Sequence, residues 1–179
     1  GVLRRLVHVF VNQEELRTIT ARGLAASLVG QVLVEESVLG WEELELEVVR
    51  DAKNQIITVC FIENVDPMGV HTGDSYCTAP MLTVPVELQQ RLERYAHSIV
   101  EAIEVIGGTN VQFAHDPVTD RVVVIEINPR TSRSSALASK ATGFPIAMVS
   151  TLLAAGLTLD EIPYWRDGTL EKYTPSGDY

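Results

Sequence analysis

The sequence predicts an α+β fold, in which antiparallel strands form a sheet and helices pack on one side of it. The first observation is an alternating pattern, because Leu44, Leu46 and Val48 are separated by glutamates. A period of two is typical of a half-buried strand, here with one acidic face. The second observation is a helical period, which predicts a buried stripe of Leu88, Leu92, Tyr95, Ile99 and Ile103.

The N-terminal part of the chain is predicted to hold one helix and one short strand. Asn12 followed by Glu15 forms the pattern of a capping box, so a helix begins here. Gly23 is expected to end this helix, because glycine readily adopts the conformation that closes a helix. Residues 32–34 are predicted to form a strand that leads into two glutamates.

The middle of the chain is predicted to be a hairpin followed by a loop and a long helix. Residues 43–48 and 55–64 form the hairpin strands, with a turn at residues 51–54. Residues 65–75 form a loop rich in glycine, aspartate and histidine. Pro85 opens the helix that carries the buried stripe, and Gly107 with Gly108 is expected to stop it.

A second hairpin and two helices complete the predicted fold. Its strands are residues 110–114 and 121–127, joined by a turn at residues 116–120. Helices are expected at residues 134–142 and 146–155, each closed by a glycine. Thr158 and Glu161 form a further capping box, and residues 165–179 are polar and irregular.

The amino-acid composition limits which classes of protein this chain can belong to. The 179 residues favour one domain, and 46% hydrophobic with 21% charged residues are ordinary globular values. A net charge of −10 argues against nucleic acid and anionic membranes as partners. No apolar run approaches the roughly 18 residues of a spanning helix, and no secretory signal is visible. Cys60 and Cys77 form no motif, so we expect reduced thiols in a cytoplasmic protein, with Cys60 in the core.

The strand that ends at residue 130 carries the clearest chemical signal. Glu126 and Asn128 are two residues apart and therefore point to the same face of a strand. Gln112, on the preceding hairpin strand, could join them across the pair. Carboxylate and amide oxygens are ligands that Mg²⁺ or Mn²⁺ prefers. The alternative is a polar cross-strand ladder at a sheet edge.

Two arginines follow this strand at the start of a helix. Arg130 and Arg133 lie within the segment at residues 130–135, which also holds three serines and opens a helix. Helix N-terminal amides with guanidinium groups make a natural anion site. The alternative is N-capping by Ser134 beside two surface arginines, and Lys140 is expected to be solvated. A metal set beside an arginine pair suggests nucleotide-dependent phosphoryl chemistry.

Two further segments could contact a nucleotide. Glu36 could accept a hydrogen bond from a sugar hydroxyl while the backbone near Val38 meets the edge of a base, or Glu36 is simply a solvated turn residue. His71 lies between Gly69 and Gly73 and could be an acid–base group, a nucleotide contact or only a loop histidine.

Several motifs together resemble the large subunit of carbamoyl phosphate synthetases. They are His-Thr-Gly-Asp-Ser at residues 71–75, Ser-Arg-Ser-Ser-Ala-Leu-Ala-Ser-Lys at 132–140, and the segments at residues 36–43, 47–51, 63–64, 68–70, 110–114 and 125–130. The resemblance covers roughly residues 13–179 and is to the first of that subunit's two ATP-grasp halves. It implies the C-terminal subdomain of an ATP-grasp fold, with an antiparallel sheet and helices packed on it.

The resemblance implies a ligase reaction and its partners. ATP phosphorylates bicarbonate to carboxyphosphate, ammonia from a glutaminase small subunit gives carbamate, and a second ATP at the other half yields carbamoyl phosphate for arginine and pyrimidine biosynthesis. The remainder of the large subunit would be a further partner.

The resemblance also implies roles for individual residues. Gln112, Glu126 and Asn128 would hold Mg²⁺ or Mn²⁺ against the phosphates of ATP, with Gln112 and Glu126 also contacting the nucleotide. The remaining nucleotide contacts would be Glu36, Val38, Glu43, Gly69, Val70 and His71. A K⁺ site would use Glu43, Asn64, Asp66, Val70 and Ser75. Arg130 and Arg133 would be catalytic, holding bicarbonate or carboxyphosphate.

The chain departs from the family at both ends. Residues 1–11 contain one glycine and lack the family's glycine-rich phosphate loop, and the preceding subdomain is missing. We therefore expect residues 1–164 to be a partial ATP-grasp subdomain and residues 165–179 a truncated tail leading to the next domain. The fragment alone is expected to make no carbamoyl phosphate. The alternatives are a catalytically inert interaction module and another ATP-grasp ligase, such as a biotin-dependent carboxylase.

Overall fold

The computed structural model describes residues 8–70, 75–164, 168–170 and 173. The chain forms two compact units, Gly1–Val38 and Leu39–Tyr179. Each is described by itself below.

The first unit contains one helix, α1 (Gln13–Ala26). The predicted capping box is confirmed, because the Asn12 side chain accepts from the Glu15 amide at 2.9 Å and Glu15 accepts from the Val11 amide. The prediction that Gly23 ends the helix is wrong. A Cβ at Gly23 would lie 2.8 Å from the Val32 side chain, so glycine here allows the returning chain to pass close to the helix. The strand predicted at residues 32–34 is also wrong, since these residues have no strand pairing.

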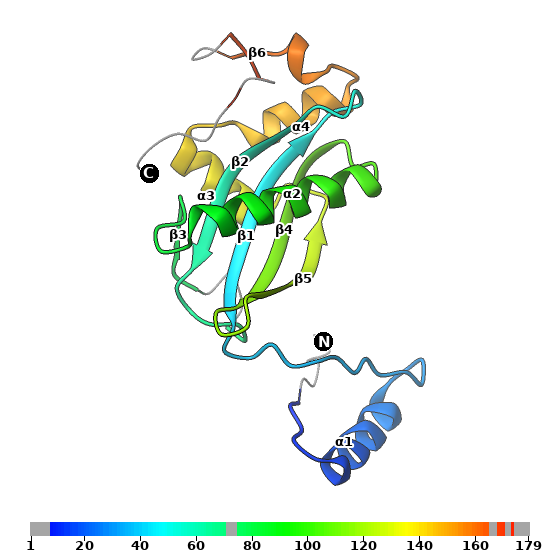
Figure 1. The fold of residues 1–179 in the computed structure, drawn as a ribbon. Helices are drawn as coiled ribbons and strands as arrows, with labels where there is room; N and C mark the ends of the chain where they lie inside the picture. Colours follow the sequence, from blue (N-terminus) through cyan, green and yellow to red (C-terminus); the bar gives the residue numbers. More distant parts are fainter. Residues whose placement is uncertain (1–7, 71–74, 165–167, 171–172, 174–179) are drawn as a thin grey trace. The chain divides into compact units, whose positions relative to one another are not determined.

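The second unit is built on a five-stranded antiparallel sheet (Figure 1). Its strands are β1 (Glu42–Arg50), β2 (Ile56–Asn64), β3 (Cys77–Thr78), β4 (Gly107–Asp116) and β5 (Arg121–Asn128), in the spatial order β3-β2-β1-β4-β5. Both predicted hairpins are confirmed, as β1 pairs with β2 and β4 pairs with β5. β1 is the central strand and pairs on its other side with β4.

Helices cover both faces of this sheet, so the prediction of helices on one side is wrong. One face packs against α2 (Val86–Ala102). The opposite face packs against α3 (Arg133–Thr142) and α4 (Ile146–Ala154), as the two helix layers in Figure 1 show. β1 is consequently buried on both sides from Glu43 to Val49, and its glutamates face the α3 side instead of bulk solvent.

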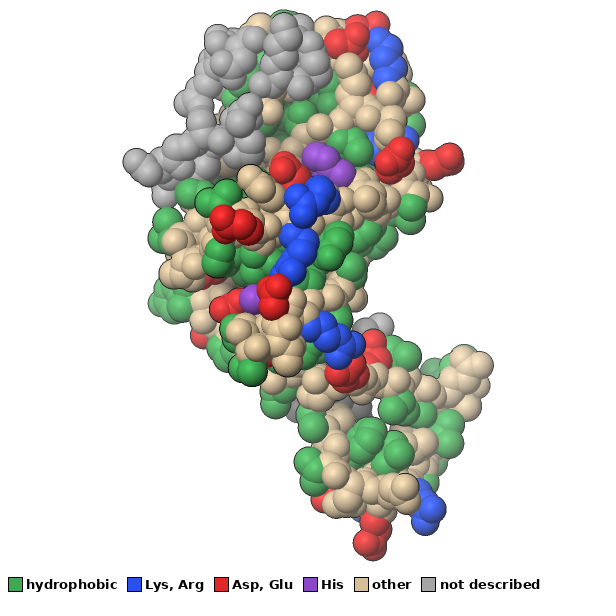
Figure 2. All heavy atoms as spheres, viewed as in Figure 1, with side chains coloured by type: hydrophobic (Ala, Val, Ile, Leu, Met, Phe, Trp, Pro, Cys, Tyr) green, Lys and Arg blue, Asp and Glu red, His purple; other side chains and the backbone are tan. Residues whose placement is uncertain are grey.

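α2 buries a stripe that differs from the predicted one. Leu88, Leu92, Ala96 and Val100 are buried, whereas Tyr95 is 43% and Ile103 44% exposed. The side chains four residues apart meet the sheet, and the outer face of the helix carries charged side chains (Figure 2).

The glycines that were expected to stop α2 instead begin β4. The helix ends at Ala102, five residues before Gly107. A Cβ at Gly108 would lie 3.0 Å from Ser150 Oγ and 3.1 Å from Ile146. The Gly108 amide also donates to Ser150 Oγ at 2.9 Å, so this glycine lets α4 approach the sheet closely.

The end of the described chain folds back on the α3–α4 side. The capping box of Thr158 and Glu161 is confirmed at a short 3₁₀ helix, η2 (Leu159–Glu161). β6 (Pro163–Tyr164) pairs with β7 (Gly168–Thr169), a strand within the stretch expected to be irregular. Phe144, Tyr164 and Tyr173 form an aromatic cluster that extends the core. The division into residues 1–164 and a tail stays a prediction.

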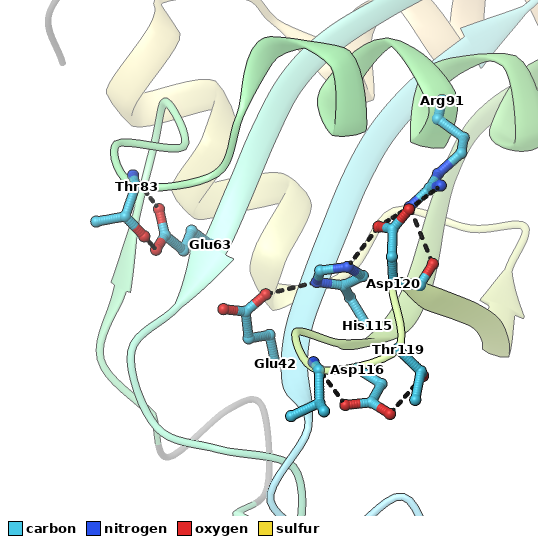
Figure 3. A network of polar contacts seen from close by, with 9 residues as sticks. Glu42, Glu63, Thr83, Arg91, His115, Asp116, Thr119 and Asp120 are labelled. Carbon is cyan, nitrogen blue, oxygen red and sulfur yellow. Dashed lines mark hydrogen bonds and ion pairs between the residues drawn. The ribbon is translucent and has the colours of Figure 1, made fainter.

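A polar network lies at the end of the sheet where β1 begins and β4 ends (Figure 3). His115 on β4 places Nδ1 2.7 Å from Glu42 and Nε2 3.0 Å from Asp120, which also binds Arg91 on α2. This network joins β1, α2 and the β4–β5 turn, a role that sequence reasoning did not assign to His115.

Both cysteines are free thiols, as expected. Cys60 lies in the core, and burial raises the pKa of its thiol to about 12. Among the described residues no single helix is long and apolar enough to cross a membrane. The bent pair of α3 and α4 meets that length and composition test only when taken together.

Candidate functional site

A cavity of about 1460 Å³ opens over the sheet face that carries the glutamates. It is bordered by β1, β2, β4, β5, the loop after β2 and the first turns of α3. Its polar lining includes Glu43, Glu45, Asn64, Ser75, Asn110, Gln112, Glu126, Asn128, Arg130, Ser132, Arg133, Ser134 and Lys140. Residues from distant parts of the second unit therefore converge on one cavity.

Gln112, Glu126 and Asn128, here called the metal set, lie together on the cavity wall. Gln112 on β4 is the direct pairing partner of Glu126 on β5, as the sequence predicted. The Asn128 amide donates to Glu126 Oε1 at 3.0 Å, so the two side chains share one face. Asn110 pairs with Asn128 two residues further along the same strands.

The metal set suits a hard divalent cation. Its oxygens come from one carboxylate and two amides, the donor types that Mg²⁺ and Mn²⁺ take. No group of three or more His, Cys, Asp or Glu able to hold a metal occurs in the described part of the chain. A cation here would thus rely on amide oxygens and leave positions for phosphate oxygens and water.

The two predicted anion-binding arginines border the same cavity. Arg130 follows β5, and its Nη2 lies 3.3 Å from Asn128 Oδ1, so it sits beside the metal set. Arg133 is the first residue of α3, and both arginines are exposed. The N-cap of α3 is Ser132, which corrects the assignment of that role to Ser134. Lys140, expected to be solvated, is exposed and also borders the cavity.

Beneath the cavity lies a buried hydrogen-bonded group that sequence reasoning missed. We call it the polar floor, and its members are Glu45, Glu47, Asn64, Asn110 and Ser135. The amides of Asn64 and Asn110 each donate to Glu45 at 2.8 Å. Asn110 and Ser135 donate to the two oxygens of Glu47 at 3.1 and 3.0 Å.

The polar floor holds two carboxylates, those of Glu45 and Glu47, inside the protein. Burial raises the pKa of Glu47, and hydrogen bonds from Ser134, Ser135 and Asn110 partly offset that rise. The signal in the sequence is the alternation of three glutamates, which predicts a half-buried strand with one acidic face. The same alternation also fits a covered layer when each acid meets hydrogen-bond donors, as Glu45 and Glu47 do here.

The residues expected to bind K⁺ are mostly brought together. Glu43, Asn64, Val70 and Ser75 line the cavity, whereas Asp66 accepts a hydrogen bond from the Tyr76 amide at 3.0 Å. Asn64 is 7% exposed, and its side-chain Oδ1 is buried with no hydrogen-bond partner among the described residues. A buried amide oxygen without a donor fits a cation ligand, because such an oxygen is otherwise costly.

The nucleotide contacts predicted from sequence are placed only in part. Glu43, Gly69, Val70, Gln112 and Glu126 border the cavity. A Cβ at Gly69 would lie 2.7 Å from Leu39, and its φ of +115° favours glycine. Glu36 and Val38 belong to the first unit, and His71 lies outside the described residues, so their roles stay predictions.

Comparison with known proteins gives one family. Residues 6–162 match the family described as carbamoyl-phosphate synthase L chain, ATP binding domain. The chain is 59% identical over 170 residues to the carbamoyl phosphate synthase large chain of Thermotoga sp. (strain RQ2), and 54% identical over 172 residues to that of Helicobacter pylori (strain ATCC 700392 / 26695). These alignments cover 94% and 96% of this chain, which spans 16% of each relative.

Solved structures share the fold at lower identity. Rhizobium etli pyruvate carboxylase superposes with a TM-score of 0.68 at 19% identity, over 84% of this chain and 13% of that one. The biotin carboxylase domain of a thermophilic 2-oxoglutarate carboxylase, bound to bicarbonate, gives 0.65 at 19% identity, over 83% of this chain and 34% of that one.

Proposed function

We propose, from the premise that this chain belongs to the carbamoyl-phosphate synthase L chain ATP-binding family, that it supplies the metal-binding and anion-binding wall of a site that phosphorylates bicarbonate with ATP. The observation that carries the proposal is the placement of the metal set and of Arg130 and Arg133 on one cavity.

The chain's own residues would position the reactants. Glu126, Gln112 and Asn128 would hold a divalent cation next to the ATP phosphates. The cation, when bound, offsets negative charge on the phosphoryl group in transfer. Arg130 and Arg133 would bind the anionic acceptor by charge-assisted hydrogen bonds and keep it near that phosphoryl group.

The wider reaction is also proposed from the relatives. Ammonia from a glutaminase subunit would displace phosphate from carboxyphosphate to give carbamate. A second ATP, bound in the remainder of the large subunit, would phosphorylate the carbamate to carbamoyl phosphate for arginine and pyrimidine synthesis. K⁺ would bind near Asn64, and the protein would act in the cytoplasm. Because the chain spans 16% of its relatives, we expect it to make no product alone.

The alternatives receive less support. The carboxylase structures are 18–20% identical and share only the fold, whereas the relatives named carbamoyl phosphate synthase reach 59%. A catalytically inert interaction module would not need a metal set or an arginine pair. Here the metal set, Arg130 and Arg133 are all present around the cavity.

The experiment is a calorimetric titration of this chain with MgATP, alongside Glu126→Ala. The matched control is Glu87→Ala, which removes an exposed carboxylate from the first turn of α2, on the opposite face of the sheet. We expect binding that Glu126→Ala abolishes and Glu87→Ala retains. Equal binding by Glu126→Ala and the unaltered chain would reject the metal assignment.

A further inference from the structure

The first turn of α3 is joined to the polar floor through one hydroxyl group. Ser135 Oγ accepts a hydrogen bond from the Ser132 amide at 3.1 Å, which closes the capping box at the start of the helix. The same oxygen donates its hydrogen to Glu47 Oε2 at 3.0 Å. Ser135 and Glu47 are 2% and 1% exposed, so this connection is shielded from water.

A serine at this capping position needs an acceptor for its hydrogen. Capping boxes usually place Glu or Gln there, whose side-chain oxygen accepts without carrying a hydrogen of its own. A serine hydroxyl carries one hydrogen, which must point away from the Ser132 amide if the oxygen is to accept from it. The Ser132 hydroxyl lies 3.2 Å away, but the Glu47 carboxylate is the stronger acceptor because the bond is charge-assisted.

The other oxygen of Glu47 bonds to a residue of β4, the strand that carries Gln112 of the metal set. Glu47 Oε1 accepts from the Asn110 amide at 3.1 Å, and Asn110 pairs with Asn128 across β4 and β5. One buried carboxylate therefore bonds both to the helix that begins with Arg133 and to the residue beside Asn128.

We propose that Glu47 is a positioning residue that holds the first turn of α3, and with it Arg133, at a fixed place beside the metal set. The proposal rests on the proposed function, because it assigns Arg133 to the anion. Glu47 touches no reactant and acts through Ser135 on one side and Asn110 on the other.

A glutamine could not replace this carboxylate fully. Its side chain has one acceptor oxygen, whereas Glu47 uses one oxygen for Ser135 and the other for Asn110. In Glu47→Gln, one of the two donors would face an NH₂ group and lose its partner.

The test compares two buried hydroxyls at opposite ends of the same helix. Ser135→Ala removes both the bond to Glu47 and the bond from the Ser132 amide. The control Thr142→Val removes a hydroxyl that likewise makes two bonds, since it donates to the Ala138 carbonyl at 2.8 Å and accepts from the Phe144 amide at 3.0 Å. Amide hydrogen exchange is followed by NMR at Ala136, which bonds to Ser132, and at Gly143, which bonds to Ser139. Affinity for inorganic phosphate is measured by calorimetry on the same samples.

We expect Ser135→Ala to lower the protection of the Ala136 amide about tenfold or more, and phosphate affinity to fall with it. Thr142→Val should leave phosphate affinity unchanged. It should lower the protection of the Ala136 amide by no more than it lowers the free energy of global unfolding. Ser135→Thr keeps the hydroxyl and should restore both. In a Glu47→Gln background, Ser135→Ala should have a smaller effect, because the acceptor has already been weakened.

Each outcome is decisive for one of the two proposals. Unchanged Ala136 protection in Ser135→Ala, or an equal loss of phosphate affinity in Thr142→Val, overturns the positioning role. If the unaltered chain binds neither phosphate nor MgATP while Ser135→Ala still loses Ala136 protection, the link from Glu47 to the first turn of α3 stands and the proposed function fails. If Glu47→Gln does not fold, Glu47→Asp takes its place, because it keeps the charge on a side chain that is one methylene shorter and so weakens the bond to Ser135 while leaving the capping bond to Ser132 intact.

Discussion

Gln112 on β4 lies directly opposite Glu126 on β5 because β5 carries one extra residue between Val124 and Glu126. From the turn, the pairing proceeds regularly to Phe113 and Val124, and a bulge then shifts the register by one. Without that shift Gln112 would face Ile125, and Glu126 would point to the α2 side of the sheet. The bulge is thus what brings the carboxylate to the cavity.

Removing an amide from the metal set should weaken metal-dependent nucleotide binding without unfolding the protein. Gln112→Ala takes away one oxygen ligand, and we expect affinity for MnATP to fall by roughly tenfold. Mn²⁺ electron paramagnetic resonance measures the bound fraction. Gln90→Ala, an exposed glutamine on α2, is the control. Equal affinities in the two variants would exclude Gln112 as a ligand.

The Asp120 network should contribute pH-dependent stability. Hydrogen bonds from Arg91 and His115 hold the pKa of the Asp120 carboxyl well below its usual range. A lowered folded-state pKa stabilises the protein above the unfolded value of about 3.9, and this stabilisation is lost as the pH falls through the folded pKa.

The measurement is urea unfolding of the unaltered chain and Asp120→Asn between pH 7 and pH 3. The unaltered chain should have the higher free energy of unfolding. Its advantage over Asp120→Asn should persist down to about pH 4 and become smaller below that pH. Glu35→Gln changes an exposed acid in the first unit and serves as the control. A difference that grows as the pH falls would contradict the network's proposed contribution.

The buried stripe of α2 can be tested by two truncations on neighbouring turns. Leu92 is fully buried against the sheet, so Leu92→Ala should cost about 2–5 kcal/mol of unfolding free energy. Tyr95→Ala, at a half-exposed position, should cost less than about 1 kcal/mol. Chemical denaturation gives both values, and similar losses would favour the stripe predicted from sequence.

Thiol labelling should report on occupation of the cavity. Cys77 is exposed and lines the cavity, whereas Cys60 is buried with its pKa raised to about 12. A disulfide reagent should therefore modify one thiol per folded chain, at Cys77, and both after unfolding. Cys77→Ser should abolish labelling of the folded chain, and MgATP should slow it in the unaltered chain. Labelling at a rate independent of MgATP would place the nucleotide elsewhere.

Much of the fold follows from local patterns. The two hairpins, the Asn12 and Thr158 caps and the helices after Pro85 and Pro145 depend on residues close in sequence, and the structure has all of them. Glu126 and Asn128 share a face for the same reason, since their spacing of two is local. Gly23 and Gly108 were interpreted wrongly, because each serves a close approach by a distant side chain instead of a helix end.

The amino-acid sequence by itself determined the two main hairpins and most of the helices, the residue types that carry the chemistry, and the shared face of Glu126 and Asn128. Only the tertiary structure decided that α3 and α4 cover the second face of the sheet. That covering turns the alternating glutamates of β1 into a buried layer bonded to Asn110 and Ser135. The physical reason is that a period of two fixes which side chains share a face, while burial of that face depends on packing by segments far away in the chain.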